Sequence, residues 1–288
     1  MGGSGNFMTS DTKVIFFGTP DYSVPVMDAL YKNYKLVAVV TQAAKLVGRK
    51  QIRTFSPVDN WAHKRKIPVF TSFEDQLPEA SFAVVASFGK IIPEKIIKHF
   101  PNGILNIHPS LLPKYRGASP IQYQIIDGIK ETGVTIIKMD AKMDHGPIIS
   151  QITDEIKDND TNETLRKRLF EKSVEILMEL LPNYLAGKIN PKEQNHDDAT
   201  FTKMISREEG YVDLQKDDTN LIDRKFRALS PWPGIFTSVK IDDRNLRLKI
   251  LKMHLDEGKL VLDKVQLEGK KAVLYKQFIQ AYPEANLP

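Results

Sequence analysis

Two side chains that lie two residues apart, Asn106 and His108, could together activate a carbonyl group. In an extended segment such residues project to the same side, here from the C-terminal end of an apolar run. An amide donor beside an imidazole can stabilise the negative charge that develops on a carbonyl oxygen, and the imidazole can exchange a proton. The structural alternative has Asn106 capping a turn and His108 packing against Pro109. For the pair alone, neither interpretation is favoured.

Two further segments could complete such a site. Ser110–Gly117, which follows Pro109, holds a further proline, a tyrosine and an arginine, and its charged groups could orient a substrate. Asp144 precedes His145 and Gly146, a pattern typical of a turn. A carboxylate near His108 would instead orient the imidazole and relay a proton. The sequence does not show that the two side chains meet.

Composition excludes several other kinds of chemistry. The chain has 288 residues and no cysteine, so disulfides, thiolate nucleophiles, zinc–thiolate sites and iron–sulfur clusters are excluded. The six histidines form no His-x-x-x-His pair, and we expect no metal. Hydrophobic residues make up 41% and charged residues 27%, as in globular domains. No apolar run approaches the roughly 18 residues of a membrane helix.

Positive charge gathers in one window. Between Thr41 and Lys66 lie seven basic residues and one acid, Asp59, whereas the whole chain carries a net charge of +5. Such a patch favours a polyanion, with nucleic acid the leading candidate. The alternative is a solvated helix face, which we prefer for Lys64–Lys66. Four of the seven basic residues, Lys45, Arg49, Lys50 and Arg53, precede the expected helix.

Alternating elements must position these residues. Short apolar runs, most of them rich in Val and Ile, predict buried strands at Lys13–Phe17, Lys35–Thr41, Phe82–Ser87, Gly103–Ile107, Gly133–Lys138 and Pro147–Thr153. Helices are expected between several of them, at Asp21–Tyr31, Ser56–Lys66 and Ser119–Asp127. Strands that alternate with helices predict an α/β, Rossmann-like, mostly parallel sheet with helices on both faces.

The second half of the chain has a different pattern. Leucines at helical spacing predict a helix over Asn162–Leu180, which Pro182 should disturb and Gly187 should follow. After a polar stretch, a helix is expected at Leu221–Leu229. Short strands then predict a small β-barrel-like, OB-like domain, at Thr237–Ile241, Leu246–Met253, Lys259–Leu267 and Lys271–Tyr275.

These patterns predict four parts. Residues 1–7 are Gly-rich and resemble a flexible leader, natural or introduced with an expression tag, rather than a targeting segment. A catalytic domain is expected over 8–188, a linker over 189–205 and a shortened C-terminal domain over 206–288. With neither signal nor cysteine, we expect a cytoplasmic protein; we also expect a monomer.

Taken together, the motifs resemble a known family. Enzymes that transfer a formyl group from 10-formyltetrahydrofolate share, in this order, Asn106, His108, the Ser-Leu-Leu-Pro-x-Tyr-Arg-Gly stretch from Ser110, Pro120-Ile121, Glu131–Thr135 and Asp144. Three further segments are similar to the methionyl-tRNA formyltransferases in particular. They are the basic loop (Thr41-Gln42, Gly48-Arg49, Ser56–Val58), Phe201–Glu209 and Arg227–Gly234. The resemblance runs from about Lys13 to Lys271.

The resemblance implies transfer of the formyl group to the α-amino group of methionyl initiator tRNA, with tRNA contacts from Lys45, Arg49, Lys50 and Arg53 of the basic loop. Asn106 and protonated His108 would stabilise the oxyanion of a tetrahedral intermediate, and Asp144 would hold His108 and assist proton transfer. Folate contacts are expected from three short segments: Phe88, Gly89, Lys90, Ile91, Ile92 and Pro93; Ser110, Leu111, Leu112 and Pro113; and Met139 and Asp140.

The chain also departs from the family pattern. Ala43–Leu46 replaces the usual Pro-Asp-Lys/Arg-Pro, Leu214 stands where Trp is common, and a hairpin is missing between Met253 and Gln266. These changes affect how RNA would be held, not the chemistry.

Three rival functions remain. A sugar-nucleotide N-formyltransferase shares the catalytic set but lacks the basic loop. A folate deformylase would carry an additional N-terminal domain. A non-catalytic RNA-binding protein would explain the basic window but not the ordered set of Asn106, His108 and Asp144.

Overall fold

The computed structural model describes residues 10–47, 51–285 and 287. They fall into two compact units. Unit 1 takes in Met1–Gly117, Glu131–Glu155 and Arg166–Phe201, and unit 2 takes in Ala118–Lys130, Ile156–Leu165 and Thr202–Pro288. The chain therefore contributes two earlier segments to the unit that contains its C-terminal part.

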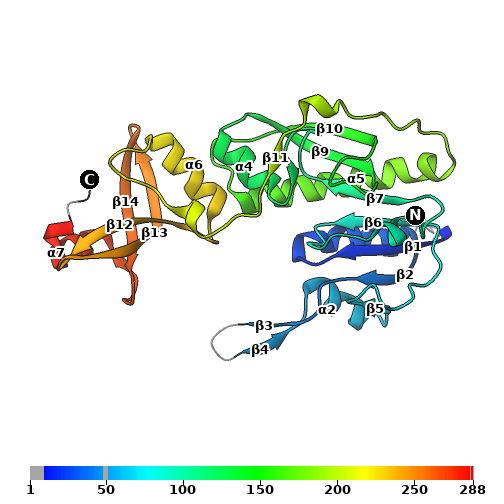
Figure 1. The fold of residues 1–288 in the computed structure, drawn as a ribbon, viewed down its shortest axis with the longest axis horizontal. Coiled ribbons are helices and arrows are strands. Elements are labelled where there is room, and N and C mark those ends of the chain that lie inside the picture. The colour runs from blue at the N-terminus through cyan, green and yellow to red at the C-terminus, as the bar shows by residue number, and fades with distance from the viewer. Residues whose placement is uncertain (1–9, 48–50, 286, 288) are drawn as a thin grey trace, which may run out of the picture. The chain divides into compact units, whose positions relative to one another are not determined.

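Unit 1 is built on a seven-stranded sheet (Figure 1). Its strands are β1 (Ser10–Gly18), β2 (Tyr34–Val40), β5 (Val69–Phe70), β6 (Phe82–Ala86), β7 (Ile104–His108), β9 (Glu131–Lys138) and β10 (Ile148–Glu155), in the order β10-β9-β7-β6-β1-β2-β5. The pairs from β7 to β5 are parallel, and β7-β9 and β9-β10 are antiparallel. This arrangement confirms the predicted mostly parallel, Rossmann-like sheet.

Four α-helices accompany this sheet: α1 (Val24–Asn33), α2 (Pro57–Lys64), α3 (Glu94–Ile97) and α5 (Asn162–Leu185), whose first turn belongs to unit 2. Short 3-10 turns lie at Asp21–Ser23 and His196–Asp198. The Ser56 hydroxyl caps α2 by accepting from the Asp59 N–H over 3.0 Å, as the Ser-Pro pattern predicted. Buried aliphatic and aromatic side chains of β1, β2 and β6, with Phe88 and Phe100, form a core.

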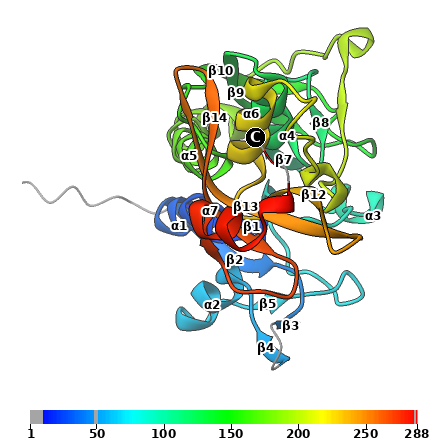
Figure 2. The ribbon, with the colours of Figure 1, turned by 90° about the vertical axis from the view of Figure 1, so that its left-hand side faces the viewer.

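Two short strand pairs were not predicted. The strands β3 (Lys45–Val47) and β4 (Ile52–Thr54) pair antiparallel inside the basic window. Both views show this hairpin projecting away from the large sheet (Figures 1 and 2). The strand β8 (Arg116–Gly117) pairs with β11 (Phe201–Thr202) at the end of the loop that follows β7.

Unit 2 contains α4 (Pro120–Asp127), α6 (Thr219–Leu229) and a four-stranded antiparallel sheet. The sheet has the order β12 (Ile235–Ile241), β13 (Arg244–Asp256), β14 (Lys259–Leu267) and β15 (Val273–Leu274), so its first and last strands are edges. Short 3-10 turns lie at Glu208–Gly210 and Pro283–Ala285. The predicted small β domain is therefore present as an open sheet. The last predicted strand, Lys271–Tyr275, is shorter in the structure, since Tyr275 begins helix α7 (Tyr275–Ala281). Phe278 of this helix is 1% exposed and packs in the core of the sheet.

Helix α5 is longer than predicted. It continues through Pro182 to Leu185: the proline lacks the N–H that would bond the preceding turn, but its own carbonyl still accepts from the Ala186 N–H over 3.1 Å. Gly187, with φ +67°, follows the end of the helix. Of the helices that the described residues form, none combines the length and apolar character needed to cross a membrane.

Candidate active site

The three side chains predicted to be catalytic meet in unit 1. Asn106 and His108 project from β7, and Asp144 follows β9. Asn106 Nδ2 donates to Asp144 Oδ1 over 3.1 Å, and His108 Nδ1 lies 3.6 Å from the same oxygen. The side chain of His108 is 5% exposed and that of Asp144 is 12% exposed. The carboxylate therefore joins the amide and the imidazole in a nearly buried cluster.

A backbone carbonyl fixes the tautomer of His108. The Nε2 atom lies 2.9 Å from the carbonyl oxygen of Tyr115. A carbonyl oxygen can only accept, so Nε2 must carry the hydrogen. The atom that takes up or releases a proton is then Nδ1, which faces Asp144. The pair can thus hold a proton and pass it between imidazole and carboxylate.

The Ser110–Gly117 loop brings two backbone groups to this cluster. The Tyr115 carbonyl accepts from His108, and the Gly117 N–H donates to Asp144 Oδ2 over 2.7 Å. The loop is held in place at Ser110, whose hydroxyl donates to the Lys114 carbonyl over 2.7 Å and whose own carbonyl accepts from the Thr135 hydroxyl over 2.6 Å. The loop therefore orients the His108 ring and the Asp144 carboxylate through its backbone.

Two residues of the predicted linker also contact the site, and sequence reasoning missed them. Gln194 is 5% exposed and donates to the carbonyl oxygens of Asp144 and Gly146 over 2.9 and 2.7 Å. His196 Nδ1 accepts from the Arg116 guanidinium over 2.8 Å. Both lie in a polar stretch whose composition is typical of a loop, so no sequence signal marks either as part of a site.

The two histidines beside the cluster stack on each other. The rings of His145 and His196 have centroids 3.9 Å apart and are inclined by 10°. Desolvation, and then the neighbouring His145 and Arg116, lower the pKa of His196, so that the neutral ring accepts from Arg116. Desolvation also lowers the pKa of the Arg116 guanidinium, against the opposing effect of Asp144 and Asp140.

Comparison with known proteins identifies the family. Residues 12–181 match the formyl transferase family, and residues 204–259 match its C-terminal domain. The methionyl-tRNA formyltransferase of Listeria monocytogenes serotype 4a is 40% identical over 238 residues, which cover 80% of this chain and 76% of the relative. The chain belongs to the methionyl-tRNA formyltransferase family. It is therefore an enzyme that transfers formyl groups.

Solved structures share the fold of this formyltransferase. The methionyl-tRNA formyltransferase from Clostridium thermocellum has a TM-score of 0.62 at 20% identity and covers 89% of this chain and 98% of its own. The sugar 3N-formyl transferase WlaRD, solved in the presence of dTDP and 5-N-formyl-THF, has a TM-score of 0.61 at 20% identity over 91% and 99% of the two chains. At such identities the likeness establishes the fold alone.

The first predicted folate segment of the formyltransferase follows β6 and is partly buried. Phe88 and Ile92 are 3% and 6% exposed and belong to the core, whereas Ile91 is 84% exposed. Gln42 Nε2 donates to the Phe88 and Gly89 carbonyls over 3.1 and 3.3 Å. Exposed Lys90 donates to the Thr71 carbonyl, just after β5, over 3.1 Å, and Pro93 precedes α3. Because the side chains of Phe88 and Ile92 are buried in the core, a ligand would contact mainly the backbone of this segment.

The remaining predicted folate residues lie close to the catalytic cluster in sequence. Ser110 and Leu112 are 0% and 3% exposed, and Leu111 and Pro113 beside them are half-buried. Met139 packs against the core, and Asp140 Oδ2 lies 2.6 Å from His145 Nδ1. Ser110 and Asp140 thus already have protein partners.

The predicted RNA contacts are only partly described. Lys45 and Arg53 stand on the β3–β4 hairpin, both exposed, and the Arg53 guanidinium lies 5.5 Å from the ring centroid of Phe55. Arg49 and Lys50 lie outside the described residues. Leu46 and Ile52 on the same hairpin are 62% and 60% exposed. An exposed hairpin with cations, an aromatic ring and bare aliphatic side chains can bind a polyanion and its bases.

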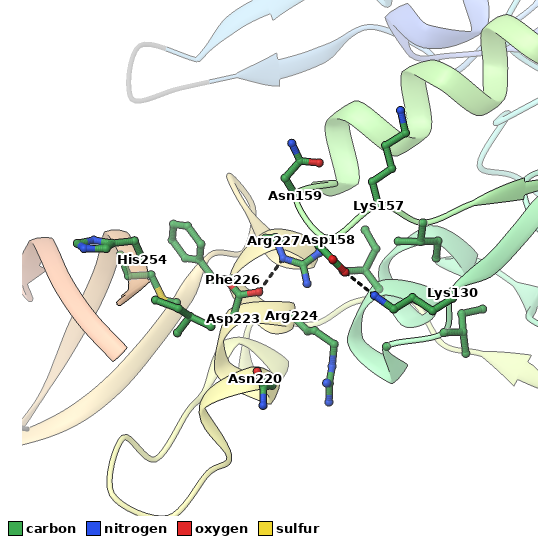
Figure 3. Close-up of a pocket in the computed structure, with 16 residues that line it drawn as sticks. Lys130, Lys157, Asp158, Asn159, Asn220, Asp223, Arg224, Phe226, Arg227 and His254 are labelled. Atoms are coloured by element: carbon green, nitrogen blue, oxygen red, sulfur yellow. Dashed lines mark hydrogen bonds and ion pairs between the residues drawn. The ribbon is translucent and has the colours of Figure 1, made fainter. Parts of the chain in front are cut away.

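A separate pocket of about 650 Å³ lies within unit 2 (Figure 3). Four cations stand around it: Lys130, Lys157, Arg224 and Arg227. Lys130 pairs with Asp158, and Arg227 pairs with Asp223 over 2.8 Å. None of the predicted catalytic or folate residues lines this pocket.

Proposed function

We propose that the enzyme transfers the formyl group of 10-formyltetrahydrofolate to the α-amino group of methionyl initiator tRNA. The observation that carries the proposal is the Asn106–His108–Asp144 cluster in a chain 40% identical to a methionyl-tRNA formyltransferase. The amine nitrogen attacks the formyl carbon, and the carbonyl oxygen becomes an oxyanion. The bond from that carbon to folate nitrogen N10 then breaks, and N10 receives the proton that the amine loses.

The geometry supports a distinct role for each side chain. Asn106 gives one amide hydrogen to Asp144 and keeps the other for the oxyanion. Protonated His108 has only Nδ1–H to offer, because Nε2 donates to the Tyr115 carbonyl. Asp144 lies within reach of Nδ1 and can accept the proton of the attacking amine and return it to N10. The reaction needs no metal, since a neutral amine is already a nucleophile.

The domains divide this work in the proposal. Residues 8–188 bind folate and carry the chemistry, with the donor held by Phe88–Pro93, Ser110–Pro113 and Met139–Asp140. Residues 189–205 link them to residues 206–288, which assist in binding RNA. The basic hairpin contributes Lys45 and Arg53, with Arg49 and Lys50 between them in sequence.

An Asn106→Ala variant tests the catalytic assignment. We expect transfer to fall by about 100- to 1000-fold, the usual effect of losing one oxyanion donor. Wild type and variant would be assayed with 10-formyltetrahydrofolate against two acceptors, methionyl initiator tRNA and nucleotide-linked amino sugars. The variant should still bind the tRNA, as measured by filter binding.

The same assay decides between acceptors. Formylated methionyl-tRNA as the product of the wild type supports the proposal. Transfer only to sugars would establish a sugar N-formyltransferase, the rival with a similar fold, and would leave the catalytic assignment in place. Full activity of Asn106→Ala would contradict that assignment whichever acceptor is used.

A second prediction concerns the basic hairpin. Arg53→Ala and Arg49→Ala should each weaken tRNA binding and reduce the slope of log affinity against log salt by about one, the effect of one lost phosphate contact. Hydrolysis of the folate donor without tRNA should stay unchanged. The matched control is Lys95→Ala, which removes an exposed lysine of α3. A slope that stays unchanged in both arginine variants would remove the hairpin from the RNA interface.

A further inference from the structure

The backbone at Asp144 has an unusual conformation. Its φ of +48° lies in the left-handed region, which residues other than glycine rarely adopt. This conformation sets the direction of the Cα–Cβ bond and thus where the carboxylate points. The carboxylate receives Asn106 Nδ2 and the Gly117 N–H on different oxygens. Something must keep the backbone from relaxing to a commoner conformation.

Gln194 supplies that restraint. Its Nε2 donates both hydrogens, one to the carbonyl oxygen of Asp144 and one to that of Gly146, over 2.9 and 2.7 Å. One accepting carbonyl belongs to Asp144 itself, and the other belongs to Gly146, two residues later. A rotation of Asp144 toward the right-handed region would turn its carbonyl away from the amide.

The Gln194 side chain is itself fixed in one orientation. Its Oε1 accepts from the Arg116 guanidinium over 2.7 Å, and Arg116 is 3% exposed. A flipped amide would place its NH2 against a cation and its oxygen against two carbonyls, so only one orientation satisfies all partners. Arg116 directly precedes Gly117, whose N–H donates to the Asp144 carboxylate. Gln194 therefore links the backbone of Asp144 to the loop segment that binds its side chain.

The backbone segments around Gln194 and Gly146 are both held in place by neighbouring strands. Lys192 and Ile148 exchange two backbone hydrogen bonds of 2.8 and 2.7 Å, which anchor the Gln194 segment to β10. A Cβ added at Gly146 would lie 1.9 Å from the Lys138 carbonyl oxygen, so the loop packs directly on the end of β9. The amide of Gln194 thus connects two anchored backbones.

We propose that Gln194 is a positioning residue that holds the Asp144 carboxylate in register with Asn106 and His108. The inference rests on the proposed function, because it assumes that Asp144 takes part in the reaction. Gln194 does not touch the reacting atoms. It acts through the backbone of Asp144, and a displacement of about 1 Å at a reacting group can cost about 100-fold in rate.

The Gln194→Met variant removes the amide and keeps the length of the side chain. We expect kcat to fall by about 100-fold with both KM values within about twofold, since the substrates' binding groups are untouched. The matched control is Asn195→Leu, because this neighbouring exposed amide donates to Asp198 Oδ2 over 2.7 Å and has no contact with Asp144. It should keep wild-type kcat. A wild-type kcat in Gln194→Met would overturn the proposal.

A double-mutant cycle separates positioning from general structural support. If Gln194 acts through Asp144, adding Gln194→Met to Asp144→Ala should cause no further loss of kcat. An equal loss in both backgrounds would show that Gln194 acts elsewhere and would overturn the inference. An Asp144→Ala variant with full activity would refute the proposed role of Asp144, and the inference with it.

If the Gln194→Met variant does not fold, Gln194→Glu provides the same test. It keeps an oxygen for Arg116 and loses both donors to the carbonyls, so the same loss of kcat and the same cycle are expected. A Gln194→Glu variant with wild-type kcat would count against the proposal as firmly as an active Gln194→Met variant.

Discussion

Replacing His108 by alanine should reduce formyl transfer by about 1000-fold or more, since the variant loses both an oxyanion donor and a proton carrier. The proton-exchanging atom is Nδ1, which faces Asp144 at 3.6 Å, while Nε2 is bound to the Tyr115 carbonyl. Initial rates with methionyl-tRNA at saturating folate donor would measure the loss. KM for both substrates should change little.

A second substitution separates chemistry from packing at this position. His108 is 4% exposed, so alanine also leaves a cavity. His108→Gln fills most of that space and can still donate to the Tyr115 carbonyl, but it cannot carry a proton. It should lose activity to a similar degree with little change in Tm. His99→Ala, which removes an exposed histidine, is the control. Turnover near wild type in His108→Gln would exclude the imidazole from the mechanism.

The placement of Asn106 and His108 on one side of β7 could be predicted because it depends on local geometry. The apolar Ile and Leu residues of this run favour a strand, and period-two alternation then places Asn106 and His108 on one side. Both side chains do reach the same Asp144 oxygen. The parallel sheet was predictable for a related reason, because apolar runs that alternate with helices have few other ways to pack.

The contact of Asp144 with His108 depends on the fold as a whole. The two residues are separated in sequence by α4 and β9. Strand β9 pairs antiparallel with β7, with Thr135 opposite His108 and Lys138 opposite Leu105, and the segment after β9 brings Asp144 to Asn106 and to the Gly117 N–H. Asp-His-Gly favours a turn in any protein. Only the family resemblance distinguished this turn from others in the chain.

Gln194 shows a limit of composition. A stretch rich in Asn, Asp and Gln predicts an exposed loop, because such residues usually hydrogen-bond water. Here one amide of the stretch is 5% exposed, since two carbonyls and a guanidinium replace its water. A sequence pattern cannot show which polar residue of a loop faces inward when its partners lie in distant segments.

The Asp144→Asn variant should lose at least about 1000-fold in kcat, a loss comparable to that seen when the carboxylate beside a catalytic histidine becomes an amide. The present carboxylate accepts from Asn106 on Oδ1 and from the Gly117 N–H on Oδ2. Asparagine has only one acceptor oxygen, so its NH2 must face either the Asn106 donor or the Gly117 N–H. It also cannot receive a proton from the amine.

Because Asn is nearly the same size as Asp, the loss should be catalytic rather than structural. Tm should fall by only a few degrees, as for one disturbed hydrogen bond, and tRNA binding should remain. Asp158→Asn, at an exposed surface pair with Lys130, is the control and should keep full activity. If Asp144→Asn retained even a tenth of wild-type kcat, proton transfer would have to run through His108 or solvent alone, and Asp144 would keep only an orienting role.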